Sequence, residues 1–526
     1  MNRPTIGHWL TALLIASAYL ASNSLAANRG ELEIRAVDKD SGGPLAVRMH
    51  LKDAKGKPVK PPKVPFWNDH FVFEGKIVLS LPTGNYTFEM EHGPEYRLMS
   101  GHFQIDNGAS DNKEVVLSRF IDMKEAGWWS GDLHIHRELK DIETLIRAED
   151  LHIAPVITWW NDKNLWNDKS LPKEPVVKFG DDRFYGLLAG EDEREGGALL
   201  YFNLTHPLPI SVATREFPPP LQFVEEARET PEAHIDIEKP FWWDMPTWVA
   251  SGQVHSIGLA HNHMHRDGIL ANEAWGKPRD MQFYPNPRGN GRWTMDIYFH
   301  LLNAGIRLPP SAGSASGVLP NPVGYNRVYV HCGEELTWEK WWENLRKGRV
   351  VVTNGPLIQP RVFCTPATAA GQDVDPEGAL PGHLFHVDEG ESVELDIGLN
   401  MSTRDKVHYL EVIQDGQVVH EVRLDEWAKA AGKLPPVKFT KSGWMVVRAV
   451  TDNAKTYRFA MTGPYYVEVG YKPRVSKKSA QFFLDWVTER AGRIKLEDPT
   501  QKAEVLQYHR QARDFWRKKV EEANAD

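Results

Sequence analysis

Alternating apolar and polar residues mark the first part of the chain as strands. In residues 31–37 and 46–51 every second side chain is apolar, and residues 76–81 and 85–90 repeat this pattern on either side of a Pro-Thr-Gly turn. A strand turns successive side chains to opposite faces, so this period is typical of a sheet with one buried face. The last two runs are spaced as a hairpin. We therefore predict a small antiparallel β-sandwich over residues 28–119.

The same period returns near the C-terminal end of the chain. It occurs in residues 392–397, 409–414, 418–424 and 444–450. These runs predict a second β-sandwich over residues 356–475. The pattern then changes to helical spacing, with apolar side chains at Val505, Tyr508, Ala512, Phe515 and Val520. A helical tail is therefore expected over residues 476–526, and we assign its apolar stripe to packing.

The middle of the chain, residues 120–355, has a different pattern. Apolar strand-like runs, such as residues 153–158, alternate there with stretches at helical spacing, such as residues 142–150 and 298–304. This alternation is typical of βα repeats around a mostly parallel sheet. A segment of about 235 residues is also the size of one β/α barrel, in which sites lie at the C-terminal ends of the strands. We therefore predict a barrel flanked by the two sandwiches.

The N-terminal segment predicts export. Arg3 precedes an apolar run over residues 9–21, and residues 24–26 form a small-residue cleavage pattern. The apolar run is too short to cross a bilayer, so residues 1–26 are expected to be a signal peptide that is cut near Ala26. No later run of the sequence is apolar for long enough to span a membrane. We expect a periplasmic or secreted protein without integral membrane contact.

Composition narrows the class of partner. The chain has 526 residues, of which 41% are hydrophobic, so it can bury several cores. Its net charge is −9 and it has no basic stripe, so we expect no nucleic-acid partner. Cys332 and Cys364 would either pair in an oxidising compartment or stay two thiols, and the sequence leaves both open. The oligomeric state is not determined by the sequence.

Two arrays of histidines indicate a metal site. The first holds His134 and His136, and the second holds His261, His263 and His265. Each array follows a short apolar run, and residues two apart on a strand face the same side. Imidazole is the commonest metal ligand. Two such arrays favour a bound divalent cation over the simpler interpretation, polar residues on the wet face of a strand.

Acidic residues end a further apolar run. Residues 187–190 lead into Glu191 and Asp192, followed by Glu193 and Arg194. Carboxylates at a strand end would complete a set of histidine and carboxylate ligands for a cation. The other interpretation is a charged hairpin turn. Glu191 and Glu193 share a face only if the strand continues, so the spacing leaves either Glu191 or Asp192 as the ligand.

Four segments of the middle region follow one another in the order of a known family. They are residues 131–136 (Gly-Asp-Leu-His-Ile-His), 189–192, 258–261 and 303–314. They resemble the motifs of the PHP (polymerase and histidinol phosphatase) superfamily, and in particular its CehA/McbA-like metallohydrolases. The resemblance implies a distorted seven-stranded β/α barrel, (β/α)7. It also implies hydrolysis of phosphoesters or related bonds with one to three divalent metal ions.

The resemblance carries over a reduced set of ligands. The metal ligands that it implies are His134, His136, His261 and one or both of Glu191 and Asp192. Where the family has an Asp-His pair and a Ser-Asp-x-His motif, this chain has Thr-Trp-Trp-Asn at residues 158–161 and Gly-Ser-Ala-Ser-Gly at residues 313–317. We therefore expect one ion, Zn²⁺ first and Mn or Fe as alternatives, with an open position for water.

Residues beside these ligands have expected roles in catalysis. Asp192 or an unligated His263 would act as general base. The expected substrate-binding residues are His265, Trp159, Trp160 and Arg194. The tryptophans would either stack on a sugar or aromatic substrate or fill the core, and His265 would otherwise belong to a polar loop.

These features together predict an exported metal-dependent hydrolase of the PHP/CehA type. It would cleave an ester, phosphoester or related bond in a small molecule or glycan. The missing ligands support an alternative, a catalytically inactive PHP-like barrel that binds a glycan or other small ligand. A third interpretation gives the function to the β domains and makes the barrel a spacer. The three differ in whether the protein holds a metal ion and turns over a substrate.

Overall fold

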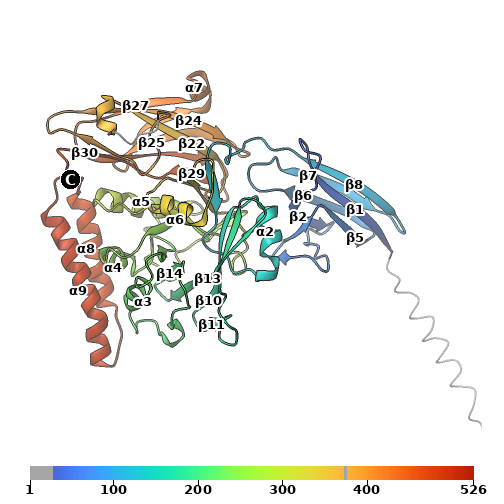
Figure 1. The fold of residues 1–526 in the computed structure, drawn as a ribbon, viewed down its shortest axis with the longest axis horizontal. Coiled ribbons are helices and arrows are strands. Elements are labelled where there is room, and N and C mark those ends of the chain that lie inside the picture. Colours follow the sequence, from blue (N-terminus) through green and yellow to red (C-terminus); the bar gives the residue numbers. More distant parts are fainter. Residues whose placement is uncertain (1–27, 372–375) are drawn as a thin grey trace, which may run out of the picture. The chain divides into compact units, whose positions relative to one another are not determined.

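The computed structural model describes residues 28–371 and 376–526 (Figure 1). The expected signal peptide, residues 1–26, lies outside the described residues, so its cleavage near Ala26 and the export of the protein stay predictions. Within the described part of the chain, no helix is both long enough and apolar enough to cross a membrane.

The chain divides into two compact units. The first comprises the described residues up to His92 together with Tyr96–Arg119, and the second comprises Gly93–Glu95 and Phe120–Asp526. The first unit has two sheets. The strands of the smaller sheet follow the order β5 (Lys76–Pro82), β1 (Arg29–Asp38), β8 (Ser110–Leu117). Those of the larger sheet follow the order β3 (Phe66–Trp67), β4 (His70–Glu74), β2 (Ala46–Asp53), β6 (Gly84–Glu91), β7 (Met99–Ile105). Alternate side chains of both sheets fill one core. β1 is antiparallel to β5 and parallel to β8.

A long mixed sheet carries the central strands of the second unit. Three strands pair in parallel, β9 (Trp128–Gly131), β10 (Ile153–Trp160) and β13 (Arg183–Arg194), and so do β15 (His234–Ile237), β16 (Ser256–Ala260) and β19 (Pro310–Ala312). Between these two groups lies β14 (Gly197–Phe202), which is antiparallel to both β13 and β15. From β9 the sheet continues through antiparallel pairs to β20 (Arg327–His331), β21 (Val350–Thr353), β29 (Phe459–Thr462) and β28 (Gly443–Thr451).

The predicted (β/α)7 barrel is therefore wrong. The protein is mostly sheet, with 39% strand and 20% helix, and its central strands are partly antiparallel, whereas a β/α barrel has parallel strands that each lead into a helix. The turn between β13 and β14 explains the error, because the apolar run 198–204 folds back onto β13 instead of starting a new βα unit. Gly196 allows this turn with a φ of 153°, a conformation that other residues rarely adopt.

Strands beyond residue 356 form a second core in this unit. A separate three-stranded sheet consists of β22 (Leu357–Thr365), β24 (Val393–Ser402) and β27 (Lys433–Phe439). The long mixed sheet also includes β23 (Leu384–Val387), β25 (Val407–Gln414), β26 (Gln417–Arg423) and β30 (Tyr465–Val469). Side chains of the two sheets, such as Leu395 and Val447, share one buried cluster. Cys332 and Cys364 form no disulfide with each other.

Helices and short strands complete the second unit. They are α2 (Ile142–Ala148), α3 (Pro220–Ala227), α4 (Met245–Ala250), α5 (Gly289–Asn303), α6 (Trp338–Arg346), α7 (Leu424–Lys429), β11 (Lys163–Asn164), β12 (Val176–Phe179), β17 (Met264–His265) and β18 (Gly268–Ile269). The tail forms two helices that pack on each other and on α4 (Figure 1), α8 (Lys477–Gly492) and α9 (Pro499–Glu521). Asp498 caps α9 by accepting two backbone N–H groups, and Val505 and Ala512 of the expected stripe are buried.

A buried ion network joins α8 to the central region. Arg490 Nε donates to Asp244 Oδ1 at 2.6 Å, and its Nη2 donates to Glu216 Oε2 at 2.5 Å. Arg215 donates to the other oxygen of Asp244 at 3.2 Å. Burial by itself would raise the pKa of Asp244, but the two guanidinium groups outweigh it and hold that pKa far below its usual range.

Arg490→Met is expected to destabilise the protein by about 3–5 kcal/mol near neutral pH, because it leaves buried carboxylates without their partner. A carboxylate whose folded pKa is lowered stabilises the fold above its unfolded pKa of about 3.9 and loses that contribution as the pH falls below it. The deficit of the variant should therefore shrink between about pH 6 and about pH 3 in urea unfolding. Arg493→Met, which removes an exposed ion pair of the same helix, is the control. An equal deficit at both pH values would contradict this role of Asp244.

Candidate metal centre

His134 and His136 follow β9 directly, on a segment held extended by its neighbours. Ile135 between them forms parallel bridges to segments on both sides. Asp132 connects this segment to its neighbour, because its Oδ1 accepts the backbone N–H of His134 and that of Ser314, both at 3.0 Å. The two imidazoles therefore face the same side, as the spacing predicted.

Three side-chain atoms converge at this place. His134 Nε2 lies 2.9 Å from His136 Nε2, and Glu191 Oε2 lies 3.2 Å from the first nitrogen and 3.0 Å from the second. Ligand atoms bound to one Zn²⁺ at about 2.0–2.2 Å lie about 3 Å from one another. All three side chains are at most 8% exposed. The donor set and its spacing fit one divalent cation.

A second carboxylate lies behind His134. Glu238 Oε1 is 3.3 Å from His134 Nδ1, and Glu238 Oε2 accepts the indole N–H of Trp242 at 3.2 Å. The ammonium of Lys239 also donates to Glu238 Oε1. A carboxylate behind a ligating imidazole fixes the tautomer whose other nitrogen turns its lone pair to the metal. His134 therefore has the environment of a metal ligand on both sides of its ring.

The charges of the centre stabilise one another. Burial lowers the pKa of His134, but Glu191 and Glu238 outweigh burial and raise that pKa to about 10. Burial raises the pKa of Glu191, but the charge of His134 outweighs it and brings that pKa down to about 2. Before an ion binds, the two carboxylates are thus balanced by an imidazolium and by Lys239. A bound cation would supply this positive charge in place of the imidazolium, because His134 must lose a proton to become a ligand.

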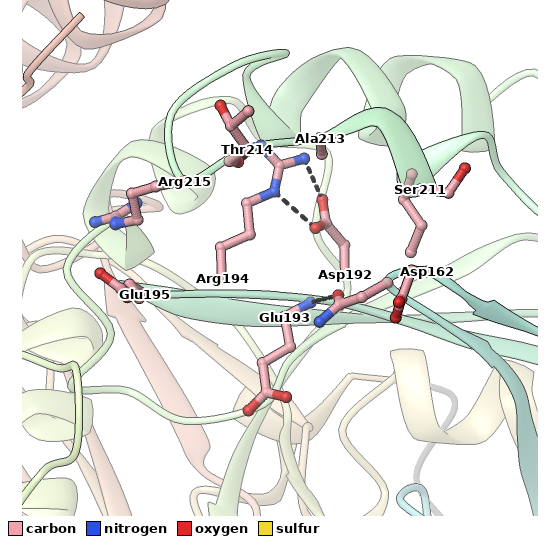
Figure 2. A pocket seen from close by; sticks show the side chains of 11 residues that line it. Asp162, Asp192, Glu193, Arg194, Glu195, Ser211, Ala213, Thr214 and Arg215 are labelled. Carbon is pink, nitrogen blue, oxygen red and sulfur yellow. Dashed lines mark hydrogen bonds and ion pairs between the residues drawn. The ribbon is translucent and has the colours of Figure 1, made fainter.

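Figure 2 shows how side chains alternate at the end of β13. Asp192 and Arg194 lie on one face, where Arg194 Nε and Nη2 donate to the two oxygens of Asp192, both at 2.7 Å. Glu193 points to the opposite face, which is also the face of Glu191. Of the two carboxylates that the sequence left open, the structure brings Glu191 to the histidines and Asp192 to Arg194. The mutual pairing of Asp192 and Arg194 speaks against their expected roles as general base and substrate ligand.

The two expected substrate-binding tryptophans have different surroundings. Trp159 is buried against Gly190, where an added Cβ would lie 1.9 Å from the indole, so this ring fills the core. The Trp160 ring lies 4.8 Å from the ring of His136, and its Nε1 donates to Glu193 Oε2 at 3.0 Å. Trp160 therefore flanks the centre, and Trp159 belongs to the core beside Gly190.

The second histidine array lies outside the group of three converging ligands. His261 Nε2 is 2.9 Å from the hydroxyl of Thr294, which itself donates to Asn290 O, so His261 Nε2 carries the proton and Nδ1 a lone pair. This Nδ1, His263 Nδ1 and His265 Nε2 are buried without a hydrogen-bond partner among the described residues. Burial lowers the pKa of all three histidines. The expected roles of His263 as base and His265 as substrate ligand stay predictions.

The first unit contains a similar cluster with a different chemistry. Asp69 lies 3.2 Å from Nδ1 of both His50 and His70. However, Arg48 Nε donates to His50 Nε2 at 3.2 Å, so this Nε2 is an acceptor and the protonated Nδ1 faces Asp69. A ligating imidazole has the opposite arrangement, with an acceptor behind it. We interpret this cluster as a hydrogen-bonded ion cluster and not as a metal site.

A polar pocket of about 270 Å³ lies on the face of β13 that carries Asp192 and Arg194 (Figure 2). The polar residues that line it are Asn161, Asp162, Asp192, Glu193, Arg194, Glu195, Ser211, Thr214 and Arg215. Glu193 also lines it, but its carboxyl group points to the opposite face of β13, and burial and then Glu191 raise the pKa of this group to about 7. Both arginines of the lining are bound to carboxylates, Arg194 to Asp192 and Arg215 to Asp244. The pocket therefore offers mainly carboxylate, amide and hydroxyl groups.

Glu238 and Lys239 were not identified from the sequence. A signal for Glu238 exists, because His234, Asp236 and Glu238 recur at period two along β15 and its continuation, which places polar groups on one face of a buried strand. No periodicity marks Lys239. Its place beside the centre becomes visible only in the folded chain.

Comparisons with known proteins do not assign this chain to a family. No protein-family model matches it, and no curated protein matches its sequence. One solved structure with partial similarity is the minor pilin GBS52 of Streptococcus agalactiae, with 21% identity over 18% of this chain and 47% of the pilin and a TM-score of 0.16. Another is the Bacillus anthracis TIE protein, with 24% identity over 22% of this chain and 20% of that protein and a TM-score of 0.14. A third is phospholipase PlaB from Legionella pneumophila, with 16% identity over 19% of this chain and 26% of the phospholipase and a TM-score of 0.14. The chain spans less than half the length of each. With such TM-scores, these similarities carry no argument about function.

Replacing both His134 and His136 by Ala is expected to abolish metal retention, because it removes two of three ligand atoms. The matched control replaces His50 and His70 by Ala, and it should leave the metal content unchanged. The measurement is elemental analysis of protein loaded with Zn²⁺ and then dialysed, with circular dichroism to verify the β-rich fold. Normal metal content in the first variant would remove both histidines from the site.

Glu191→Gln and Asp192→Asn separate the two neighbouring carboxylates. Glu191→Gln should weaken Zn²⁺ binding at least about tenfold with a small change in stability. Asp192→Asn should keep the ion and lower the free energy of unfolding by about 2–5 kcal/mol, because Arg194 loses its buried partner. Competition with a fluorescent chelator measures affinity, and urea unfolding measures stability. The reverse pattern would make Asp192 the ligand.

Proposed function

We propose that this chain is an exported hydrolase that uses one divalent metal ion. The observation that carries the proposal is the convergence of His134 Nε2, His136 Nε2 and Glu191 Oε2 within 3.2 Å of one another, with Glu238 behind His134. Two imidazoles and a carboxylate are a common ligand set of catalytic zinc, so Zn²⁺ is the first choice, before Mn or Fe. An ion bound there lowers the pKa of a water molecule and polarises the substrate's carbonyl or phosphoryl oxygen.

The chain's own residues would orient the ligands and the substrate. Glu238 holds the ring of His134 in one orientation and tautomer. Trp160 covers His136 on one side and limits the access of water. Glu193 presents its carboxyl group on the face of β13 that also carries Glu191, where Trp160 donates to one of its oxygens.

The lining of the pocket favours a neutral, hydroxylated substrate. Asp162, Glu193 and Glu195 line it, and its two arginines are already bound to carboxylates. A phosphate group would be repelled by these carboxylates, whereas sugar hydroxyls can donate to them. We therefore place the scissile bond in an ester or related bond of a glycan or other polyol, in preference to a phosphoester.

The order of the four sequence motifs supports a relationship to the PHP superfamily. Residues 131–136 and 189–192 contribute all three converging ligands. Residues 258–261 contribute His261, which lies outside this group of three. The proposed relationship concerns the ligands and their order along the chain, and the barrel is no part of it, since the sheet is mixed. Export is proposed from residues 1–26 alone.

A second candidate is a protein that binds a glycan without turnover. One observation favours it, because the ligand atoms are buried and the pocket lies on the Asp192 face of β13, opposite the face that carries Glu191. A sugar held by the pocket would then touch no metal ligand. The two candidates therefore predict opposite outcomes for a bound saccharide ester, which the hydrolase would cleave and the binding protein would leave intact.

Mature protein loaded with Zn²⁺ is expected to release acetate from p-nitrophenyl acetate and from acetylated methyl glucoside, and to cleave p-nitrophenyl phosphate more slowly. A chelator should abolish this activity and added Zn²⁺ should restore it. Glu191→Gln should lower kcat/KM at least about 100-fold because it removes a ligand, and His50→Ala should not change it. Saccharide binding in calorimetry without cleavage of any of these esters would instead support the second candidate.

A further inference from the structure

A second pocket, of about 490 Å³, is lined by residues of α5, β25 and β28. Its volume is in the usual range of small-molecule sites. One wall is a single face of α5 and its N-cap, because the lining residues Arg288, Arg292, Met295, Asp296 and Phe299 recur at helical spacing. The three converging ligands of the candidate metal centre are not among the residues that line this pocket. The pocket is therefore a separate candidate site.

The wall formed by the sheet is balanced in charge. Glu411 of β25 lies opposite Arg448 of β28 in the register of the two strands, and Arg448 Nε donates to Glu411 Oε2 at 2.7 Å. Asp452, which follows β28, has its Oδ2 3.6 Å from the ammonium of Lys406. Each carboxylate of this wall thus has a cationic partner.

Two guanidinium groups of the helical wall have no such partner. Arg288 and Arg292 are one turn apart on the same side of the helix, where the backbone N–H of Arg292 donates to Arg288 O at 3.2 Å. Arg288 Nη2 donates to Thr451 O at 3.0 Å, and its Nε is buried without a hydrogen-bond partner in the described part of the chain. Arg292 is exposed, and no described carboxylate forms an ion pair with either arginine. Two neighbouring cations without a counter-ion favour a bound anion, and a guanidinium fits a carboxylate through two parallel N–H groups.

A carboxylate follows one turn after Arg292 on the same face. Asp296 Oδ2 accepts the hydroxyl of Tyr284, and within residues 28–371 and 376–526 no cation forms an ion pair with Asp296. One helical turn rises about 5.4 Å, which is comparable to the width of a sugar ring. A carboxylate accepts hydrogen bonds from hydroxyl groups and repels an anion. The wall therefore fits a ligand with a carboxylate at one end and hydroxyl groups at the other.

Aromatic side chains complete the lining. Phe283 and Tyr409 both line the pocket, and they are 72% and 46% exposed. The Tyr457 ring lies behind the arginines, with its centroid 5.4 Å from the guanidinium carbon of Arg288. An exposed aromatic ring beside a pocket offers an apolar surface that a ligand can cover. The C–H groups on the face of a sugar ring are suited to such a surface.

We propose that this pocket binds a sugar acid. The carboxylate of a uronate unit lies on Arg292 and Arg288, its hydroxyl groups point toward Asp296, and its ring lies against Phe283 or Tyr409. The inference goes beyond the proposed function, and it holds with or without a metal ion, because the two sites share no residue. In a glycan esterase, such a pocket would hold an acidic unit of the polymer away from the scissile bond.

Three small probes test the two halves of this inference by calorimetry on the full mature chain. Methyl glucuronide carries both the carboxylate and the hydroxyl groups, methyl glucoside lacks the carboxylate, and cyclohexanecarboxylate lacks the hydroxyl groups. Methyl glucuronide is expected to bind at least about tenfold more tightly than either of the others. The same affinities are expected before and after treatment with a chelator.

Variants of exposed residues locate the binding. Arg292→Gln should weaken the binding of methyl glucuronide at least about tenfold, because it removes a charged pair of N–H donors. Phe283→Ala should weaken it about threefold or more through the lost ring contact. Arg510→Gln, which changes an exposed arginine of α9, is the matched control and should have no effect. Thermal unfolding verifies that each variant is folded.

The possible outcomes each decide the inference. Equal affinity for the glucuronide and the glucoside, or unchanged affinity in Arg292→Gln, would overturn the role of the arginines. Equally tight binding of cyclohexanecarboxylate would show a general carboxylate site and overturn the assignment to a sugar. If none of the three probes binds, the inference is wrong as a whole. Because metal content and ester hydrolysis are measured separately, none of these results bears on the proposed function.

Discussion

The contact between Glu238 and His134 is the interaction on which the candidate centre depends. Glu238 is buried, so its oxygens must be satisfied by protein donors, and the donors present are the indole of Trp242, the ammonium of Lys239 and Nδ1 of His134. These contacts fix the orientation of the His134 ring. The orientation of that ring in turn decides that Nε2 meets His136 and Glu191. A single buried carboxylate therefore links the ligands on one side to the lysine on the other.

An antiparallel strand sets the distance between the two carboxylates. β14 pairs with β13 on one side and with β15 on the other, so Leu200 lies opposite Glu191 in one pair and opposite Asp236 in the other. Glu191 and the end of β15 are thereby placed two strands apart at the same level of the sheet. The hairpin that excludes the expected βα repeat is thus the element that brings Glu191 near Glu238. The departure from the predicted fold and the geometry of the centre have the same cause.

Predictions from the sequence were most accurate where they depended on local periodicity. Alternation placed His134 and His136 on one face, and it showed that Glu191 and Glu193 would share a face if the strand continued. Prediction failed where it required the partner of a strand. The apolar run 198–204 is compatible with a hairpin or with a new βα unit, because period and apolarity do not specify the neighbour. Likewise, His50 and His70 carry ligand atoms as close to a carboxylate as those of the proposed site. The two clusters differ in what lies behind the rings, which is Arg48 behind His50 and Glu238 behind His134.

The sequence by itself determined which segments are strands or helices and which of their side chains face the same way, because these properties follow from backbone geometry over a few residues. It also determined that imidazoles and carboxylates stand at the ends of apolar runs. Only the tertiary structure decided that Glu191 and not Asp192 meets the histidines, that Glu238 lies behind His134, and that Lys239 donates to this same Glu238. Such sets form between residues that are far apart along the chain, and their distances depend on strand order, register and the burial of charge.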